Sequence, residues 1–127
     1  MTRTHSDLSK TEWLIMNICW EKGKSSARDI YEETLRKKER GYQTVKTMLD
    51  RLVAKGYLTR EKFGPIWLYD PAVQKEDIVE NEIDSFADRV LGNTIAPLFA
   101  HLAKKERLST DEIQVLKNLI NQHEEEL

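Results

Sequence analysis

Residues 43–58, which read QTVKTMLDRLVAKGYL, have the apolar spacing of a helix that packs on one side only. Apolar side chains recur at i, i+3, i+4 and i+7, namely Val45, Met48, Leu49 and Leu52. This spacing predicts a helix over about residues 44–55, and Gly56 is the type of residue that commonly follows a helix end. The opposite side is polar, and it comprises Gln43, Lys46, Thr47, Asp50 and Ala54, flanked by Thr44 and Arg51.

Two further helices are expected before this one. Ser9 and Glu12 have the S-x-x-E spacing of a capping box, which predicts a helix that stops at Gly23. A second helix should begin after Ser25-Ser26. Its inner face is expected to hold Ala27, Ile30, Tyr31 and Thr34, and its solvated outer face includes Arg28.

A β-hairpin is expected directly after the third helix. Residues 57–63 and 66–69 are rich in β-forming side chains, and Gly64-Pro65 between them has the composition of a turn. Three helices followed by a hairpin form the order of a winged helix-turn-helix domain.

The remainder of the chain has the pattern of short amphipathic helices. Val79, Ile83, Phe86 and Val90 form a heptad-like seam before Gly92, and Pro97 is tolerable only in the first turn of the next helix. A second S-x-x-E box, at residues 109–112, opens a last helix with an inner face of Ile113, Leu116, Leu119 and Ile120. The predicted fold is mainly α with a small β-hairpin wing: a winged helix-turn-helix over residues 1–71 and a helical dimerisation region over residues 72–127.

The charge distribution favours a polyanionic partner for the first half. The 127-residue chain has a net charge of −2, but residues 1–70 contain 14 Lys and Arg against 10 Asp and Glu. The remainder contains 6 against 12. A DNA major groove about 12 Å wide admits one helix. We therefore expect groove contacts from Gln43, Thr44, Lys46 and Thr47, and phosphate contacts from Arg51, Arg60 and Lys62; an ordinary solvated helix face is the alternative.

Several segments resemble the penicillinase-repressor (BlaI/MecI/CopY) family. They are LSKTEW at 8–13, YQTVKTMLDRL at 42–52 and KGYLTR at 55–60, with Met16 and Cys19-Trp20. The resemblance covers nearly the whole chain, and TVKT-x-L-x-RL-x-x-KG is its most specific part. It implies a bacterial repressor whose dimers bind double-stranded operators with dyad symmetry and block transcription of β-lactam-resistance or copper-homeostasis genes.

A homodimer is also expected on physical grounds, because one small domain makes few phosphate contacts and three short helices make a thin core. The candidate dimerisation residues are Val79, Ile83, Phe86, Val90, Leu98, Leu102, Leu116 and Leu119. The alternative is that these apolar stripes pack only within one chain.

Three departures from the family pattern bear on the inducing signal and on the wing. The tail lacks the paired C-x-C motifs that hold Cu(I) in copper-responsive members, which argues against a thiolate copper switch. Family members cut by a protease linked to a membrane sensor are cleaved at an Asn-Phe bond, which aligns with His101-Leu102 here. The wing turn has no basic residue at its tip.

The sequence argues against an enzyme, a cofactor or a metal site. It has no phosphate-binding glycine loop and no catalytic serine or zinc-binding motif, and His5, His101 and His123 are far apart. Cys19 is expected to be a buried thiol in a cytoplasmic protein, and no segment suits membrane insertion. Two alternatives to signal-released DNA binding stay open: a winged-helix module that binds a protein, and a repressor released directly by a small ligand or metal.

Overall fold

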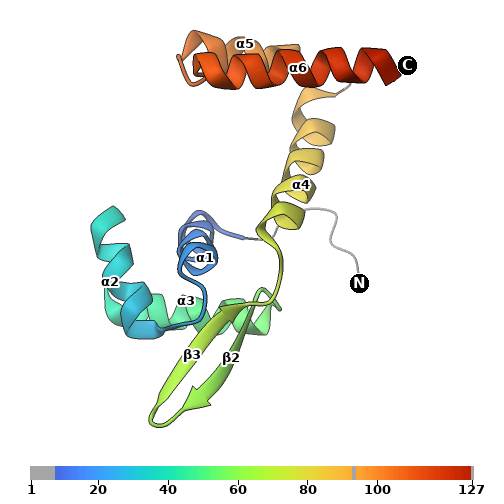
Figure 1. Ribbon diagram of the computed structural model, residues 1–127. Helices are drawn as coiled ribbons and strands as arrows, with labels where there is room; N and C mark the ends of the chain where they lie inside the picture. The colour runs from blue at the N-terminus through green and yellow to red at the C-terminus, as the bar shows by residue number, and fades with distance from the viewer. Residues whose placement is uncertain (1–7, 93, 127) are drawn as a thin grey trace. The chain divides into compact units, whose positions relative to one another are not determined.

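The computed structural model describes residues 8–92 and 94–126, and these form six α-helices, one π-helical segment and three β-strands. Figure 1 labels the α-helices and the two hairpin strands β2 and β3. The chain divides into two compact units, one that extends to Asp84 and one that begins at Ser85. The mainly α fold with a β-hairpin wing is confirmed, and the first unit has the element order of a winged helix-turn-helix.

Helix α1, Lys10–Lys22, has the predicted boundaries because both of its ends are capped by local chemistry. The Glu12 backbone N–H donates to Ser9 Oγ at 3.1 Å, and the Ser9 N–H donates to Glu12 Oε1 at 2.9 Å, which completes the capping box. At the other end Gly23 has φ of +76°, a conformation that side chains disfavour.

Helices α2, Ala27–Lys37, and α3, Tyr42–Ala54, follow α1. Helix α3 begins two residues before the predicted start, with Gly41 in extended conformation as its N-cap. It ends in a Schellman motif: the Gly56 N–H donates to Val53 O and the Tyr57 N–H donates to Leu52 O, both at 3.0 Å. Gly56 has φ of +88°, which confirms its role as the helix stop.

The wing consists of β2, Leu58–Phe63, and β3, Ile66–Pro71, joined by a turn at Gly64-Pro65. A third strand, β1 at Ser25–Ser26, pairs with β3, so that the sheet order is β1-β3-β2. Strand β1 is not predicted from the sequence, because two serines in succession have neither the length nor the alternation that predicts a strand.

The core of the first unit lies between α1, α2, α3 and the base of the hairpin. Its fully buried residues come from every one of these elements: Ile15, Met16, Ile18, Cys19, Ile30, Val45, Leu49, Leu52, Tyr57, Leu58 and Tyr69. Ile78 of α4, Lys75–Phe86, is also buried in this core, and the Trp20 indole N–H donates to Val73 O at 3.0 Å. The start of α4 is therefore fixed to the first unit, while the predicted functional boundary after residue 71 stays a prediction.

The second unit contains the end of α4, a π-helical segment Ala87–Leu91, α5 at Ala96–Lys104 and α6 at Thr110–Glu126. Pro97 lies in the first turn of α5, and Ser109 and Glu112 form the predicted capping box. The prediction that α6 has a buried inner face is wrong for the single chain. Ile113, Leu119 and Ile120 are exposed and Leu116 is half-buried, because α5 alone covers too little of α6.

Candidate nucleic-acid interface

Helix α3 separates a fully buried apolar face from an exposed polar one. Val45, Leu49 and Leu52 have no exposed area and hold the helix against α1, α2 and the hairpin. On the other side Gln43, Thr44, Thr47 and Arg51 are exposed, as the spacing predicted. These four side chains stand at the surface of a helix whose inner face cannot rotate without opening the core.

Lys46 and Asp50 connect the polar face of α3 to the wing. Lys46 Nζ donates to Asp50 Oδ2 and to Tyr69 Oη, both at 2.8 Å. The Tyr69 hydroxyl donates to Asp50 Oδ1 at 2.7 Å, and Arg60 Nη1 donates to the same oxygen at 3.1 Å. Lys46 is thus half-buried in a polar cluster, whereas helical periodicity alone predicts that it lies on a simple outward face.

The charges of this cluster hold Asp50 ionised. Burial raises the pKa of Asp50, but hydrogen bonds from Lys46 and Tyr69 and the charges of Lys46 and Arg60 outweigh it and lower the pKa below 3.8. For Lys46 burial acts in the opposite sense, and the hydrogen bond to Asp50 leaves its pKa raised. Burial is also the main reason why the pKa of Tyr69 is raised. At neutral pH the cluster therefore holds two cations and one carboxylate.

The two cations of the hairpin share a face with Tyr69. In the register of β2 and β3, Arg60 lies opposite Tyr69 and Lys62 opposite Trp67. The Arg60 guanidinium lies 4.7 Å and Lys62 Nζ 5.6 Å from the centre of the Trp67 ring. Trp67 packs beneath these cations, so Arg60 and Lys62 stand at the surface on the side of the hairpin that faces α3.

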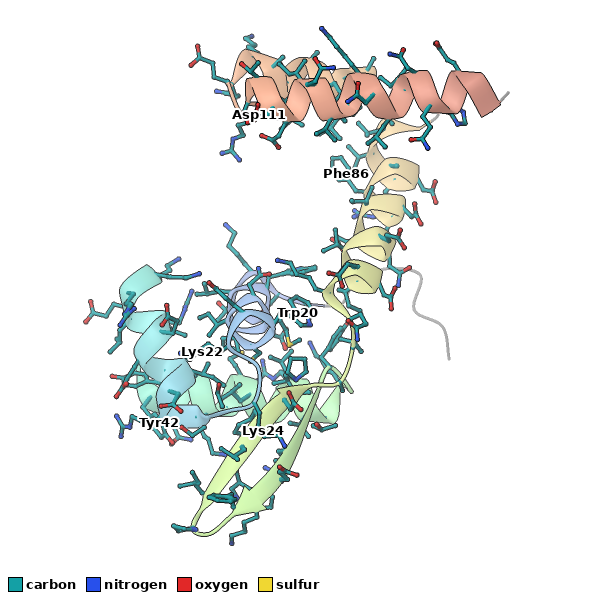
Figure 2. All side chains as sticks on the ribbon, viewed as in Figure 1. Trp20, Lys22, Lys24, Tyr42, Phe86 and Asp111 are labelled. Atoms are coloured by element: carbon teal, nitrogen blue, oxygen red, sulfur yellow. The ribbon has the colours of Figure 1, made fainter. Side chains whose placement is uncertain are left out.

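Arg28 makes tertiary contacts, although the sequence predicts only that it lies on the solvated face of its helix. Its guanidinium lies 4.8 Å from the Tyr42 ring centre and 5.5 Å from that of Tyr31, and the two rings meet edge to face. Tyr42, the first residue of α3, is labelled in Figure 2. Arg28, Tyr42 and Lys46 line a hollow of about 230 Å³ together with wing residues that include Ile66 and Trp67. The i, i+3 spacing of Arg28 and Tyr31 was the available signal, but the contact with Tyr42 is tertiary.

The wing tip is apolar. Phe63 and Ile66 face each other across the turn, and 69% of Phe63 is exposed. The cations of the wing therefore lie along the hairpin and not at its end.

The candidate dimerisation residues are largely uncovered. Ile83, Phe86, Val90 and Leu119 are exposed, while Val79, Leu98, Leu102 and Leu116 are half-buried. Helices α5 and α6 together form an apolar groove of about 530 Å³, lined by Ile95, Phe99, Leu116, Leu119, Ile120, His123 and Glu124. The His101-Leu102 bond lies inside α5, with His101 exposed.

The remaining single residues have structural roles. Cys19 is buried, and burial together with the charge of Asp70 raises the pKa of its thiol to about 12. In residues 8–92 and 94–126 no group of His, Cys, Asp and Glu side chains could hold a metal ion; His5 lies outside those ranges. Over the same residues, no helix has the length and apolar character that a bilayer crossing requires.

The fold and this surface define a winged-helix protein with a helical C-terminal region. Residues 8–122 match the penicillinase repressor family. The chain belongs to that family, which comprises transcriptional repressors, and the expectation that it is not an enzyme is confirmed by this membership.

Relatives and a solved structure are similar over most of their own lengths. The chain is 35% identical to the methicillin resistance regulatory protein MecI of Staphylococcus aureus strain N315 over 115 residues, 91% of this chain and 94% of that protein. It is 31% identical to the penicillinase repressor of Staphylococcus aureus over 121 residues, 95% and 96% of the two chains. The monomeric form of Bacillus licheniformis BlaI, solved in complex with the blaP half-operator, matches 61% of this chain and 93% of its own at 26% identity, with a TM-score of 0.51.

Proposed function

We propose that the chain is a homodimeric repressor that binds a double-stranded operator with dyad symmetry and inserts α3 into the major groove. The observation that carries the proposal is the arrangement of α3 and the hairpin. A helix with a fully buried apolar face presents Gln43, Thr44 and Thr47 outward, beside a hairpin that carries Arg60 and Lys62 on the adjoining face. This arrangement suits one helix in the groove and cations along the flanking phosphates.

The candidate contacts divide by chemistry. Gln43, Thr44 and Thr47 have side chains that donate to and accept from base edges, and they lie in the first turns of α3. Arg51, Arg60 and Lys62 are suited to phosphates, which position the protein without reading sequence. Lys46, which donates to Tyr69 of the wing, is proposed as a groove contact that lies between these two sets of residues.

The solved relative supports the choice of partner. BlaI of Bacillus licheniformis was solved with the blaP half-operator, and MecI is a regulator of methicillin resistance. By this similarity we propose that the genes under control are of the β-lactam-resistance type.

The dimer is supported by the apolar area that the second unit leaves exposed. Its exposed large side chains are Phe86, Val90, Ile95, Ile113, Val115, Leu119 and Ile120. Exposed apolar area of this extent marks an interaction surface on most proteins. A second copy that fills the groove between α5 and α6 would cover Ile95, Leu119 and Ile120 of this set. It would also bring two α3 helices to one operator, about 34–36 Å or a multiple apart.

Release by cleavage near His101-Leu102 is a further part of the proposal. The bond lies within α5, so a protease would need that helix to unwind locally before it could bind the chain. Release by a small ligand or metal is the alternative outcome, and it would appear as loss of operator binding by the intact chain when the inducer is added.

Selection from a randomised duplex pool, followed by titration at several salt concentrations, tests the proposal. We expect a palindromic consensus and a log–log slope of binding constant against salt near −0.9 for each phosphate neutralised. A pool that yields no consensus, or a shallow slope of the kind given by a protein partner, would contradict it. The Gln43→Ala and Thr47→Ala variants should lose discrimination at individual base pairs, while Arg36→Ala on the exposed end of α2 is the control.

A further inference from the structure

Asp50 is the one acidic residue in the sequence of α3, and it lies on the polar face of that helix. A carboxylate on a surface that meets phosphates repels them. Its presence there is a cost to any binding of nucleic acid, so that some other property of Asp50 must offset the repulsion.

The carboxylate joins three elements at one point. It accepts hydrogen bonds from Lys46 of α3, Tyr69 of β3 and Arg60 of β2, at 2.8, 2.7 and 3.1 Å. Tyr69 has no exposed area, whereas 40% of the Asp50 side chain is exposed. Asp50 therefore connects the half-buried Lys46 and the exposed Arg60 to a hydroxyl group that is fixed in the core.

We propose that Asp50 is a positioning residue that fixes Lys46 and Arg60 in one geometry on the DNA-binding surface and so increases discrimination between operator and other DNA. The proposal rests on the proposed function. Long basic side chains lose rotamer freedom when they bind, and side chains already held in place lose less. The same carboxylate offsets part of the positive charge that attracts any duplex. It therefore weakens the binding that does not depend on DNA sequence.

Charge and position are separated by two substitutions at Asp50. Asp50→Asn removes the charge, so it should steepen the salt slope on a shuffled duplex by about 0.9 and tighten binding to it. On the duplex selected by the wild-type chain, Asp50→Asn should bind about tenfold more weakly, within the range of coupled neighbours. Asp50→Glu keeps the charge but moves the carboxylate by one methylene, so it should weaken binding to the selected duplex and leave the shuffled duplex unchanged.

Tyr69→Phe supplies a third variant that alters no formal charge. It removes the hydroxyl that bridges Lys46 and Asp50 and leaves the ring in the core. We expect this variant to bind the selected duplex severalfold more weakly and to bind the shuffled duplex as tightly as the wild type does. Asp77→Asn, at an exposed position on α4, has the same charge change as Asp50→Asn and serves as the matched control. It should change the affinity for the two duplexes by the same small factor.

The experiment uses full-length protein, the selected duplex and a shuffled duplex of equal length and composition, with thermal melts to confirm that each variant is folded. If Asp50→Asn tightens binding to both duplexes by the same factor and Asp50→Glu behaves as wild type, Asp50 acts only as a repulsive charge and the proposal is overturned. Unchanged discrimination in all three variants also overturns it. In both cases the proposed function stands, because the wild type still discriminates; a wild type that selects no consensus overturns both.

Discussion

Glu12 forms a buried ion pair whose loss should destabilise the first unit by a measurable amount. Only 2% of the residue is exposed, and its two carboxylate oxygens each lie 3.0 Å from Lys55 Nζ. Removing one partner of a buried pair costs about 3–5 kcal/mol. The Lys55 side chain is 25% exposed, so water can replace part of its interaction with the lost carboxylate. The Gln side chain can still accept the hydrogen bond from the Ser9 N–H. We therefore expect Glu12→Gln to lower the free energy of unfolding by about 2 kcal/mol.

The acid dependence of stability gives the same pair an independent signature. Burial raises the pKa of Glu12, but hydrogen bonds from Ser9 and Lys55 and the Lys55 charge outweigh it and lower the pKa below its ordinary 4.5. A lowered pKa in the folded state means that the stabilisation is complete above about pH 4.5 and is lost as the pH falls through the folded value. Glu12→Gln should therefore flatten the fall in stability below that pH.

Urea titration followed by tryptophan fluorescence measures both effects, because the tryptophans at positions 13, 20 and 67 all lie in the first unit. A loss of about 2 kcal/mol corresponds to a midpoint lower by about 1 M urea. Glu21→Gln, at an exposed position on the same helix, is the matched control and should change stability by less than about 0.5 kcal/mol. A Glu12→Gln midpoint equal to that of wild type at neutral pH, or an unchanged acid profile, would refute the reasoning.

Three further predictions concern the surface, the interface and the core. Lys46→Ala should weaken operator binding and reduce the magnitude of the salt slope by about 0.9 if Lys46 reaches a phosphate; unchanged affinity in a fluorescence anisotropy titration would remove it from the interface. Phe86→Asp should convert dimers to monomers in sedimentation velocity and lose operator affinity, and a variant that stays dimeric would place the interface elsewhere. Because burial and the Asp70 charge raise the pKa of Cys19 to about 12, a thiol reagent at about pH 8 should label it only when urea unfolds the first unit; rapid labelling of the folded chain would contradict its burial.

Local signals explain why most elements could be predicted from the sequence. The boundaries of α1 follow from the Ser9 capping box and Gly23, and the hairpin follows from Gly64-Pro65 between two β-rich segments. The start of α3 was less accurate because Gly41 caps it without a side-chain hydrogen bond, and so leaves no residue signature.

The parts of the candidate site that the sequence did not reveal depend on tertiary contacts. Helical periodicity placed Lys46 and Asp50 on one face, but their partners Arg60 and Tyr69 lie 10 and 19 residues beyond Asp50. Only the pairing of β2 with β3 brings those two side chains together. A pattern with a period of 3.6 residues contains no information about that pairing.

Three contacts along α3 share one mechanical consequence. Its first turn is held by the Tyr42 ring against Tyr31 of α2, its middle by Asp50 against the wing, and its C-cap residue Lys55 by the ion pair to Glu12 of α1. A rotation of about 20° about the helix axis would move an outward side chain by about 2 Å, since such side chains end about 5–6 Å from the axis. That displacement exceeds the tolerance of a hydrogen bond to a base edge. Contacts to three different elements resist such a rotation more than any one of them alone. The sequence discrimination that we propose for Gln43, Thr44 and Thr47 would therefore depend on residues that need not touch DNA.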